Sequence, residues 1–261
     1  TGAMSPAAEC CITVRNIGPL EGEVVVPGAK NAVLKLMAAS LLADGVFEIS
    51  NVPAIADVQI MSDLLTAIGL RIVQPDSENL VITNSGDLTP VAPYELVERI
   101  RASINVLGPL LTRCGHVRLS MPGGDDFGAR PIDLHVKGLE AMGARFRFAD
   151  GYLEASAERL HGATITFDFP SVGATENLVT AAVLADGVTT IDNAAREPEI
   201  IDLCNYLVKM GARIDGIGTA TLVVTGVERG QLHSCTHETV PDRIQAATYI
   251  AACAVAGGEL D

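Results

Sequence analysis

The chain has 261 residues, and 48% of them are hydrophobic, which is enough for one large domain or two smaller ones. Its formal net charge is −14 and its pI about 4.7, which argues against nucleic acid as a partner. An anionic ligand must therefore be held by local cations. Apolar stretches such as LVTAAVLADGV are too short to cross a membrane, so no membrane partner is expected.

The cysteines indicate a reducing compartment. All six are spaced in a way that suggests no disulfide framework, and no secretory signal precedes them. We therefore expect the protein to work in the cytoplasm.

The first predicted helix has a cation at its start. In the segment VPGAKNAVLKLMAASLL, Gly28 ends a strand, and Lys30 and Asn31 stand at the mouth of an otherwise apolar helix. A lysine beside exposed backbone N–H groups is an arrangement that binds phosphate or carboxylate. A solvated lysine on a first turn explains the same pattern, and the motif alone does not decide between them.

A repeat organises the chain. Residues 41–72 resemble residues 183–214 without a gap. Each copy reads as the end of an apolar helix, a Gly turn, a strand, a loop with Asn and Pro, an amphipathic helix stopped by Gly, and a final strand. This is a βαβ-type unit, and the likeliest loops are residues 75–80, 84–95 and 227–238.

A middle copy begins at Arg101, in the stretch RASINVLGPLL, so the period is roughly 70 residues. Its second helix contains His135, which we interpret as a hydrogen-bonded packing residue. Between its strand and that helix the copy carries extra residues, MPGGDDFGARP, with Asp125 and Arg130 in a glycine-rich frame. An acid beside a cation that holds phosphate is able to deliver a proton, but a solvated turn has the same composition.

The third copy starts its helix at FPSVGATENL. Ser171, Gly173 and Thr175 offer hydroxyls and free amides that could cradle a diphosphate. The alternative is an ordinary N-cap with Glu176 in the first turn.

A fourth copy begins near Val240 and the sequence ends within it. We therefore predict a strand segment at 12–29 that belongs with a second domain, a complete three-unit α/β domain at 30–239, and the start of a second domain, truncated, at 240–261.

Six motifs occur in the order found in a known family: GAKNAVLK, RASINVLGPL, PGGDDFGARPIDLH, SVGATEN, NAAREPEIIDL and PDRI. From about Ile12 to Asp261 the chain resembles the UDP-N-acetylglucosamine enolpyruvyltransferases of the enolpyruvyl transferase family. The resemblance implies the enolpyruvyl transferase fold, with inside-out α/β domains of three repeated units and the active site between two such domains. It also implies transfer of enolpyruvyl from phosphoenolpyruvate to the 3-hydroxyl of UDP-N-acetylglucosamine, the committed step of peptidoglycan synthesis, without a metal or an organic cofactor.

The resemblance also assigns residues. The catalytic group is Asp125, Lys30 and Arg130. The phosphoenolpyruvate-binding group is Lys30, Asn31, Arg101 and Arg130. The nucleotide-sugar-binding group is Asn31, Arg101, Arg130, Pro131, Ile132, Asp133, Leu134, Ser171, Val172 and Gly173. The base that takes the hydroxyl proton belongs to the second domain in this family, so we expect the isolated chain to be inactive.

The sequence departs from the family at three positions. Asp125 replaces the loop cysteine of most members, and it needs a raised pKa to act as an acid because an ordinary aspartate has a pKa near 3.9. Asn105 replaces a larger aromatic residue, and Phe169 stands where a basic residue is common. The alternatives are a paralogue acting on another nucleotide and the shikimate-pathway relative. The unit broken at Asp261 motivates a third alternative, a non-catalytic or split half that needs a partner chain.

Overall fold

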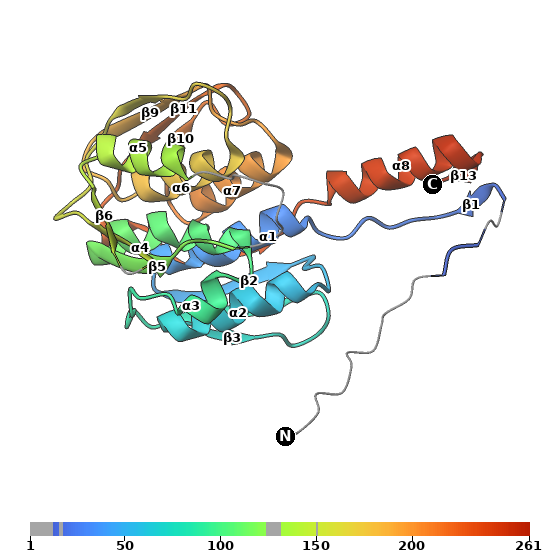
Figure 1. Ribbon diagram of the computed structural model, residues 1–261, viewed down its shortest axis with the longest axis horizontal. Coiled ribbons are helices and arrows are strands. Elements are labelled where there is room, and N and C mark those ends of the chain that lie inside the picture. Colours follow the sequence, from blue (N-terminus) through green and yellow to red (C-terminus); the bar gives the residue numbers. More distant parts are fainter. Residues whose placement is uncertain (1–12, 16–17, 124–131, 150) are drawn as a thin grey trace, which may run out of the picture. The chain divides into compact units, whose positions relative to one another are not determined.

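A computed structural model describes residues 13–15, 18–123, 132–149 and 151–261 (Figure 1). Clustering of contacts divides the chain into two units. The larger contains Pro27–Asp242, and the smaller combines the residues up to Val26 with Arg243–Asp261.

The larger unit repeats one order of elements three times: an inner helix, a strand, an outer helix and two further strands. The first repeat contains α1 (Lys30–Ala39), η1 (Ser40–Leu42), β2 (Gly45–Ser50), α2 (Ala56–Ile68), β3 (Arg71–Val73) and β4 (Leu80–Asn84). The second contains η2 (Arg101–Val106), α4 (Leu107–Cys114), β5 (His116–Ser120), α5 (Asp133–Ala141), β6 (Arg145–Ala149) and β7 (Tyr152–Ser156). The third contains α6 (Val172–Ala182), β9 (Val188–Asp192), α7 (Pro198–Lys209), β10 (Arg213–Asp215) and β11 (Thr221–Thr225).

Each repeat ends in a hairpin, which the sequence pattern did not predict. The last strand returns antiparallel between the other two, so the orders are β2-β4-β3, β5-β7-β6 and β9-β11-β10. Residues 75–80 therefore join β3 to β4, although Leu80, counted as loop, already belongs to β4. The βαβ-type unit is confirmed with one strand added.

The linking segments close the three sheets into a ring. After the first repeat, and before the short helix α3 (Tyr94–Val97), Val91 bridges in parallel to Arg118 of β5. After the second, β8 (Thr164–Thr166) pairs in parallel with β9. After the third, and beyond the 3₁₀ turn η3 (Arg229–Gln231), β12 (Thr236–Glu238) pairs in parallel with β2 of the first repeat. Each repeat thus completes the sheet of the next, and β12 is a strand inside a stretch expected to be a loop.

Two asparagine side chains hydrogen-bond to the linking segments beside these parallel strand pairs. Asn51 and Asn193 follow β2 and β9 with φ of 53° and 57°, a left-handed conformation that asparagine tolerates. Their side-chain amides donate to the carbonyls of Thr239 and Phe167 on the linking segments. Both therefore hold the linking strand beside the first strand of a repeat.

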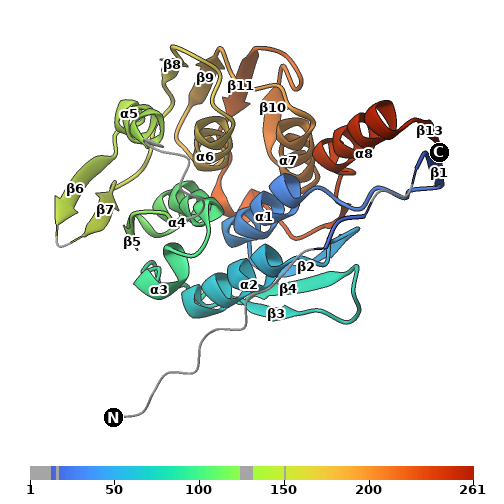
Figure 2. The same cartoon turned by 45° about the vertical axis from the view of Figure 1, so that its right-hand side comes forward.

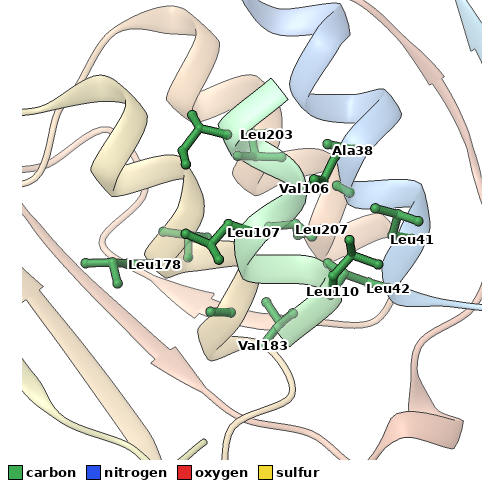
Figure 3. Packing of buried hydrophobic residues seen from close by; sticks show 14 of the residues in the cluster. Ala38, Leu41, Leu42, Val106, Leu107, Leu110, Leu178, Val183, Leu203 and Leu207 are labelled. Carbon is green, nitrogen blue, oxygen red and sulfur yellow. The ribbon is translucent and has the colours of Figure 1, made fainter. Parts of the chain in front are cut away.

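The core lies between the inner helices. Every residue from Ala32 to Ala39 of α1 and from Ala174 to Ala182 of α6 is buried. A helix that is apolar on all sides needs neighbours on all sides. The sheets with β2 and with β9 lie on opposite sides of these helices (Figures 1 and 2), and side chains of α1, η1, η2, α4, α6 and α7 meet in one cluster (Figure 3). This arrangement, with helices inside and sheets outside, is the predicted inside-out α/β fold.

The inner helix of the second repeat is broken. We expected one apolar helix from Arg101, but residues 101–106 form a 3₁₀ turn and the α-helix begins at Leu107. Pro109 has no N–H to donate to the carbonyl four residues earlier. At the break, the Asn177 amide donates to the Ile104 carbonyl (3.1 Å) and accepts from the Gly108 N–H (2.8 Å), so it replaces a helical hydrogen bond.

In the smaller unit, β1 (Leu20–Gly22) pairs in parallel with β13 (Gly258–Leu260), and α8 (Arg243–Ala256) precedes β13. Apolar side chains of α8 are strongly exposed, with Ile250 at 70% and Val255 at 91%. A pocket of about 430 Å³ between Val24, Tyr249 and Leu260 is apolar, so it is a poor site for an anion. Within the described residues, every helix is too short or too polar to cross a membrane.

The close approach of α4 to α6 depends on Gly108. A Cβ there would collide with the backbone carbonyl of Asn177, which cannot move without shifting α6. We expect Gly108→Ala to lower the free energy of unfolding by about 2 kcal/mol in urea titrations, even though alanine favours helix. Gly230→Ala is the control, because a Cβ at Gly230 meets nothing within 4 Å. Equal effects of the two substitutions would contradict this account.

Candidate active site at the starts of the inner helices

The three inner helices start at the same end of the core. Lys35 Nζ lies 3.7 Å from Glu176 Oε1, and the Asn177 amide donates to Asn105 Oδ1 at 3.3 Å. Each of these residues stands four or five positions after the start of its own helix. Residues at equal depth in their helices touch, so the N-terminal ends of α1, η2 and α6 lie together, and the helix dipoles favour anions there.

Lys30 is paired. Its ammonium lies 2.9 Å from Asp57 Oδ1 in the first turn of α2, with 47% of the lysine side chain exposed. Its backbone N–H points to Asp242 Oδ2 at 3.4 Å. The predicted cation therefore stands at the helix start with a carboxylate on either side. Neither aspartate was predicted as part of the site, because an acid in a first turn is common and the PDRI motif that contains Asp242 carried only the family resemblance.

Arg101 joins the start of η2 to the end of β5. Its Nη1 donates to the Pro122 carbonyl at 3.3 Å, and the Gly123 N–H donates to Val97 at 3.4 Å. The residues that lead into the inserted loop are therefore anchored to the segment 97–101. Asp125, Arg130 and Pro131 lie outside the described residues. Asn31, the second residue of α1, is half-buried beside Lys30.

The start of α6 is capped by its own side chains. Ser171 Oγ accepts from the Ala174 N–H at 3.4 Å, as the N-cap interpretation predicted, although a ligand that approaches the half-buried Ser171–Gly173 backbone remains compatible with it. Thr175 was wrongly expected to offer a free hydroxyl. It is fully buried, donates to the Ser171 carbonyl and accepts from Ala195.

The start of α5 presents one polar side chain. Asp133 is exposed and lies 3.7 Å from Lys137, whereas Ile132 and Leu134 are buried in the core. Among the described residues of the predicted stretch 130–134, only Asp133 is placed to meet a ligand through its side chain. Ile132 and Leu134 have only their backbone to offer.

His135 is a packing residue, as predicted. It is 6% exposed, and its Nδ1 lies 2.9 Å from the Asn177 amide nitrogen, which assigns Nδ1 as the acceptor of a neutral ring. Burial, together with the charge of Arg101, lowers the pKa of His135 to about 4, against a smaller opposing effect of Asp133. The ring also faces Gly173, so it links the starts of α5, η2 and α6.

Glu176, which the N-cap alternative placed in the first turn of the helix, is a buried carboxyl at the fifth position of α6. It is 2% exposed, and its Oε2 accepts from the Asn105 amide at 3.2 Å. Its Oε1 faces Lys35 and has no hydrogen-bond partner among the residues that the structure describes. Burial raises the pKa of Glu176 to about 7, Lys35 and Asn105 oppose that rise, and Glu199 adds to it.

Comparison with known proteins identifies the family. The family model for EPSP synthase (3-phosphoshikimate 1-carboxyvinyltransferase) matches residues 14–261. The chain belongs to the EPSP synthase family. It is 51% identical over 250 residues to the UDP-N-acetylglucosamine 1-carboxyvinyltransferase of Shewanella amazonensis (strain ATCC BAA-1098 / SB2B), covering 95% of this chain and 59% of that relative.

Solved structures confirm the fold of the EPSP synthase family. The enolpyruvyl transferase NikO from Streptomyces tendae is similar with a TM-score of 0.80 and 25% identity, over 91% of this chain and 56% of that one. An EPSP synthase from Acinetobacter baumannii is similar with a TM-score of 0.72 and 17% identity, over 93% and 55%. The chain thus spans little more than half of each relative, and the predicted enolpyruvyl transferase fold is confirmed.

The shifted pKa values of Glu176 and His135 predict opposite pH dependences of the free energy of unfolding. Folding takes up a proton at Glu176 between pH 4.5 and about 7, because its pKa is higher in the folded state, so this contribution to stability is lost as the pH rises. Folding releases a proton at His135 between pH 6.5 and about 4, so its contribution is lost as the pH falls. The two contributions oppose each other over most of this range.

Single substitutions separate them. Relative to Glu176→Gln, the parent should lose up to about 1.4 kcal/mol of unfolding free energy per pH unit between pH 4.5 and 7. Relative to His135→Asn, it should gain a similar amount per unit between pH 4 and 6.5. Urea titrations at half-unit steps measure both differences. Two differences of the same sign would contradict the assigned shifts.

Proposed function

We propose that the protein transfers the enolpyruvyl group of phosphoenolpyruvate to the 3-hydroxyl of UDP-N-acetylglucosamine and releases phosphate. The observation that carries this proposal is the 51% identity over 95% of the chain to a UDP-N-acetylglucosamine 1-carboxyvinyltransferase. The identity to NikO is only 25%, so a paralogue with another acceptor is less well supported. In this proposal the reaction is the committed step of peptidoglycan synthesis.

The helix starts supply a binding surface that suits this reaction. In our proposal Lys30, Asn31 and Arg101 bind the phosphate and carboxylate of phosphoenolpyruvate together with Arg130, because charge-assisted bonds and helix N-termini both stabilise anions. The starts of α5 and α6, at 130–134 and 171–173, would line the nucleotide-sugar site. Neutral His135 supports both starts without adding charge.

The chemical step needs an acid and a base. Asp125 would give a proton to the methylene carbon of phosphoenolpyruvate while the 3-hydroxyl oxygen bonds to the adjacent carbon and a base takes the hydroxyl proton. Loss of a proton from the new methyl group and departure of phosphate then restore the double bond. We propose that the base lies in a second domain, to which 12–29 and 240–261 contribute, and that no metal or organic cofactor takes part.

The proposed place of the reaction is the cytoplasm. All four cysteines among the described residues, Cys114, Cys204, Cys235 and Cys253, are free thiols, which suits a reducing compartment.

Phosphate release by the full-length protein tests the proposed function. We expect release with phosphoenolpyruvate and UDP-N-acetylglucosamine together, and none when uridine monophosphate or shikimate 3-phosphate replaces the nucleotide sugar. Turnover with shikimate 3-phosphate instead would assign the other branch of the family.

Lys30→Met should lower kcat/KM for phosphoenolpyruvate by roughly 10- to 100-fold, because it removes charge-assisted bonds worth about 1.5–3 kcal/mol. Lys209→Met is the matched control, since Lys209 is exposed at the far end of α7. Steady-state kinetics of both variants in the full-length protein make the comparison. A Lys30→Met variant within twofold of the parent would remove Lys30 from the site.

Asp125 predicts insensitivity to fosfomycin. An epoxide alkylates the loop cysteine of this family because a thiolate is a strong nucleophile, and a carboxylate is a much weaker one. We expect the full-length protein to gain no adduct by mass spectrometry, and Asp125→Cys to stay active and become sensitive. Asp125→Asn should lose most turnover while keeping affinity for UDP-N-acetylglucosamine. Full activity of Asp125→Asn would show that another group delivers the proton.

A further inference from the structure

Three equivalent positions in the repeats carry polar side chains that meet inside the apolar core. The offset from Lys35 to Asn105 is 70 residues and that from Lys35 to Asn177 is 142, the same offsets that separate Gly45 from Gly115 and Gly187. All three residues are at least nine-tenths buried. The inner helices therefore turn the same position toward a common centre.

Glu176 connects the polar side chains that meet at this centre. Its two carboxylate oxygens face Lys35 of α1 and the Asn105 amide of η2, and Asn105 in turn accepts from Asn177. Asn177 carries the network on to His135 of α5 and to the break between η2 and α4. We call Lys35, Asn105, His135, Glu176 and Asn177 the polar cluster. It stands one helical turn behind the starts of three inner helices.

We propose that Glu176 is a positioning residue of the candidate site: its carboxylate holds Lys35 and Asn105, and thereby fixes the first turns of α1 and η2 against α6. These turns carry Lys30, Asn31 and Arg101, so the proposal rests on the proposed function for its catalytic consequence. Glu176 acts through these residues and touches no substrate.

The polar contacts of Glu176 position the helix starts more specifically than apolar packing would. A buried ion pair is often no more stable than apolar side chains of the same volume, so stability alone does not account for it. The hydrogen bond that Glu176 accepts from Asn105 does have a fixed geometry, unlike the apolar contacts around it. Loss of the negative charge leaves the Lys35 ammonium without its counter-ion and weakens the Asn105 bond, and the two helix starts lose their common anchor.

The positioning should depend on pH, because Glu176 titrates near neutrality. The charged groups that act on it are Lys35 from α1 and Glu199 from α7. Among the other elements packed on α6, η2 contributes Arg101 and α5 contributes His135, which is neutral above about pH 4. In the parent, the ionised fraction therefore rises as the pH passes through about 7.

The first test compares kcat/KM for phosphoenolpyruvate between pH 6 and 8 in the full-length protein. We expect the ratio of the parent to Glu176→Gln to rise from near one at pH 6 to about tenfold at pH 8, since only the parent gains the charge. Thr180→Val is the matched control. Thr180 lies one turn further along α6, and its hydroxyl bonds only to helix carbonyls in the described structure, so its ratio to the parent should stay constant.

A double variant tests whether the pair acts as one unit. Lys35→Met with Glu176→Gln leaves no buried charge alone, and its kcat/KM at pH 8 should lie within twofold of that of Glu176→Gln. If Glu176→Gln does not fold, the double variant carries the pH comparison. A parent-to-variant ratio of kcat/KM that is independent of pH would overturn the proposal. So would a double variant whose loss of kcat/KM equals the product of the losses of the two single variants.

Amide hydrogen exchange tests the positioning without any substrate. At pH 8, Glu176→Gln should speed exchange in residues 30–34 and 101–104 by at least tenfold, and Thr180→Val should not. Unchanged exchange would overturn the positioning role whatever the activity. A parent protein that releases no phosphate would overturn the proposed function alone, and exchange would still decide the role of Glu176.

Discussion

The structure depends on the packing of three apolar helices against one another. Because α1 and α6 are buried on every side, they must be surrounded, and the outer helices and three sheets provide the surroundings. This explains why the sheets face outward and why central strands such as β4 and β11 alternate between buried and half-exposed positions along most of their length. It also explains the glycine at position 108, where two inner helices approach too closely for a side chain.

The same packing confines polar chemistry to one end of the core. Helix starts carry unpaired N–H groups, and here three such ends converge. Lys30 and Arg101 stand at two of these ends on or near the surface, and Asp133 at the start of the outer helix α5, while the polar cluster lies one turn deeper. The outer residues suit ligand binding and the inner ones suit support, because the inner ones are closed off from solvent.

The sequence predicted those features that a local pattern encodes. The gapless repeat located the outer helices and the glycines that end them, and Gly69 and Gly211 indeed have φ of 122° and 108°. Predicting β12 failed because its partner β2 lies 188 residues away and only three residues pair, so no periodicity marks it. Lys35 and Glu176 were missed for a related reason: in an apolar helix, one polar residue signals nothing until its partner on another helix is known. Lys35 and Glu176 lie in the motifs GAKNAVLK and SVGATEN, but the resemblance assigned a role to neither.

The ring of linking strands has a consequence for synthesis. Strand β2 leaves the ribosome well before its partner β12, since Glu48 and Thr236 are 188 residues apart, so one edge of β2 stays open until Thr236–Glu238 has emerged. An open strand edge invites pairing with other chains, and pairing over such a sequence distance is slow. A nascent chain that stalls before Thr236 therefore holds a first repeat whose sheet is incomplete, and such a chain is a natural client for chaperones that shield exposed strands.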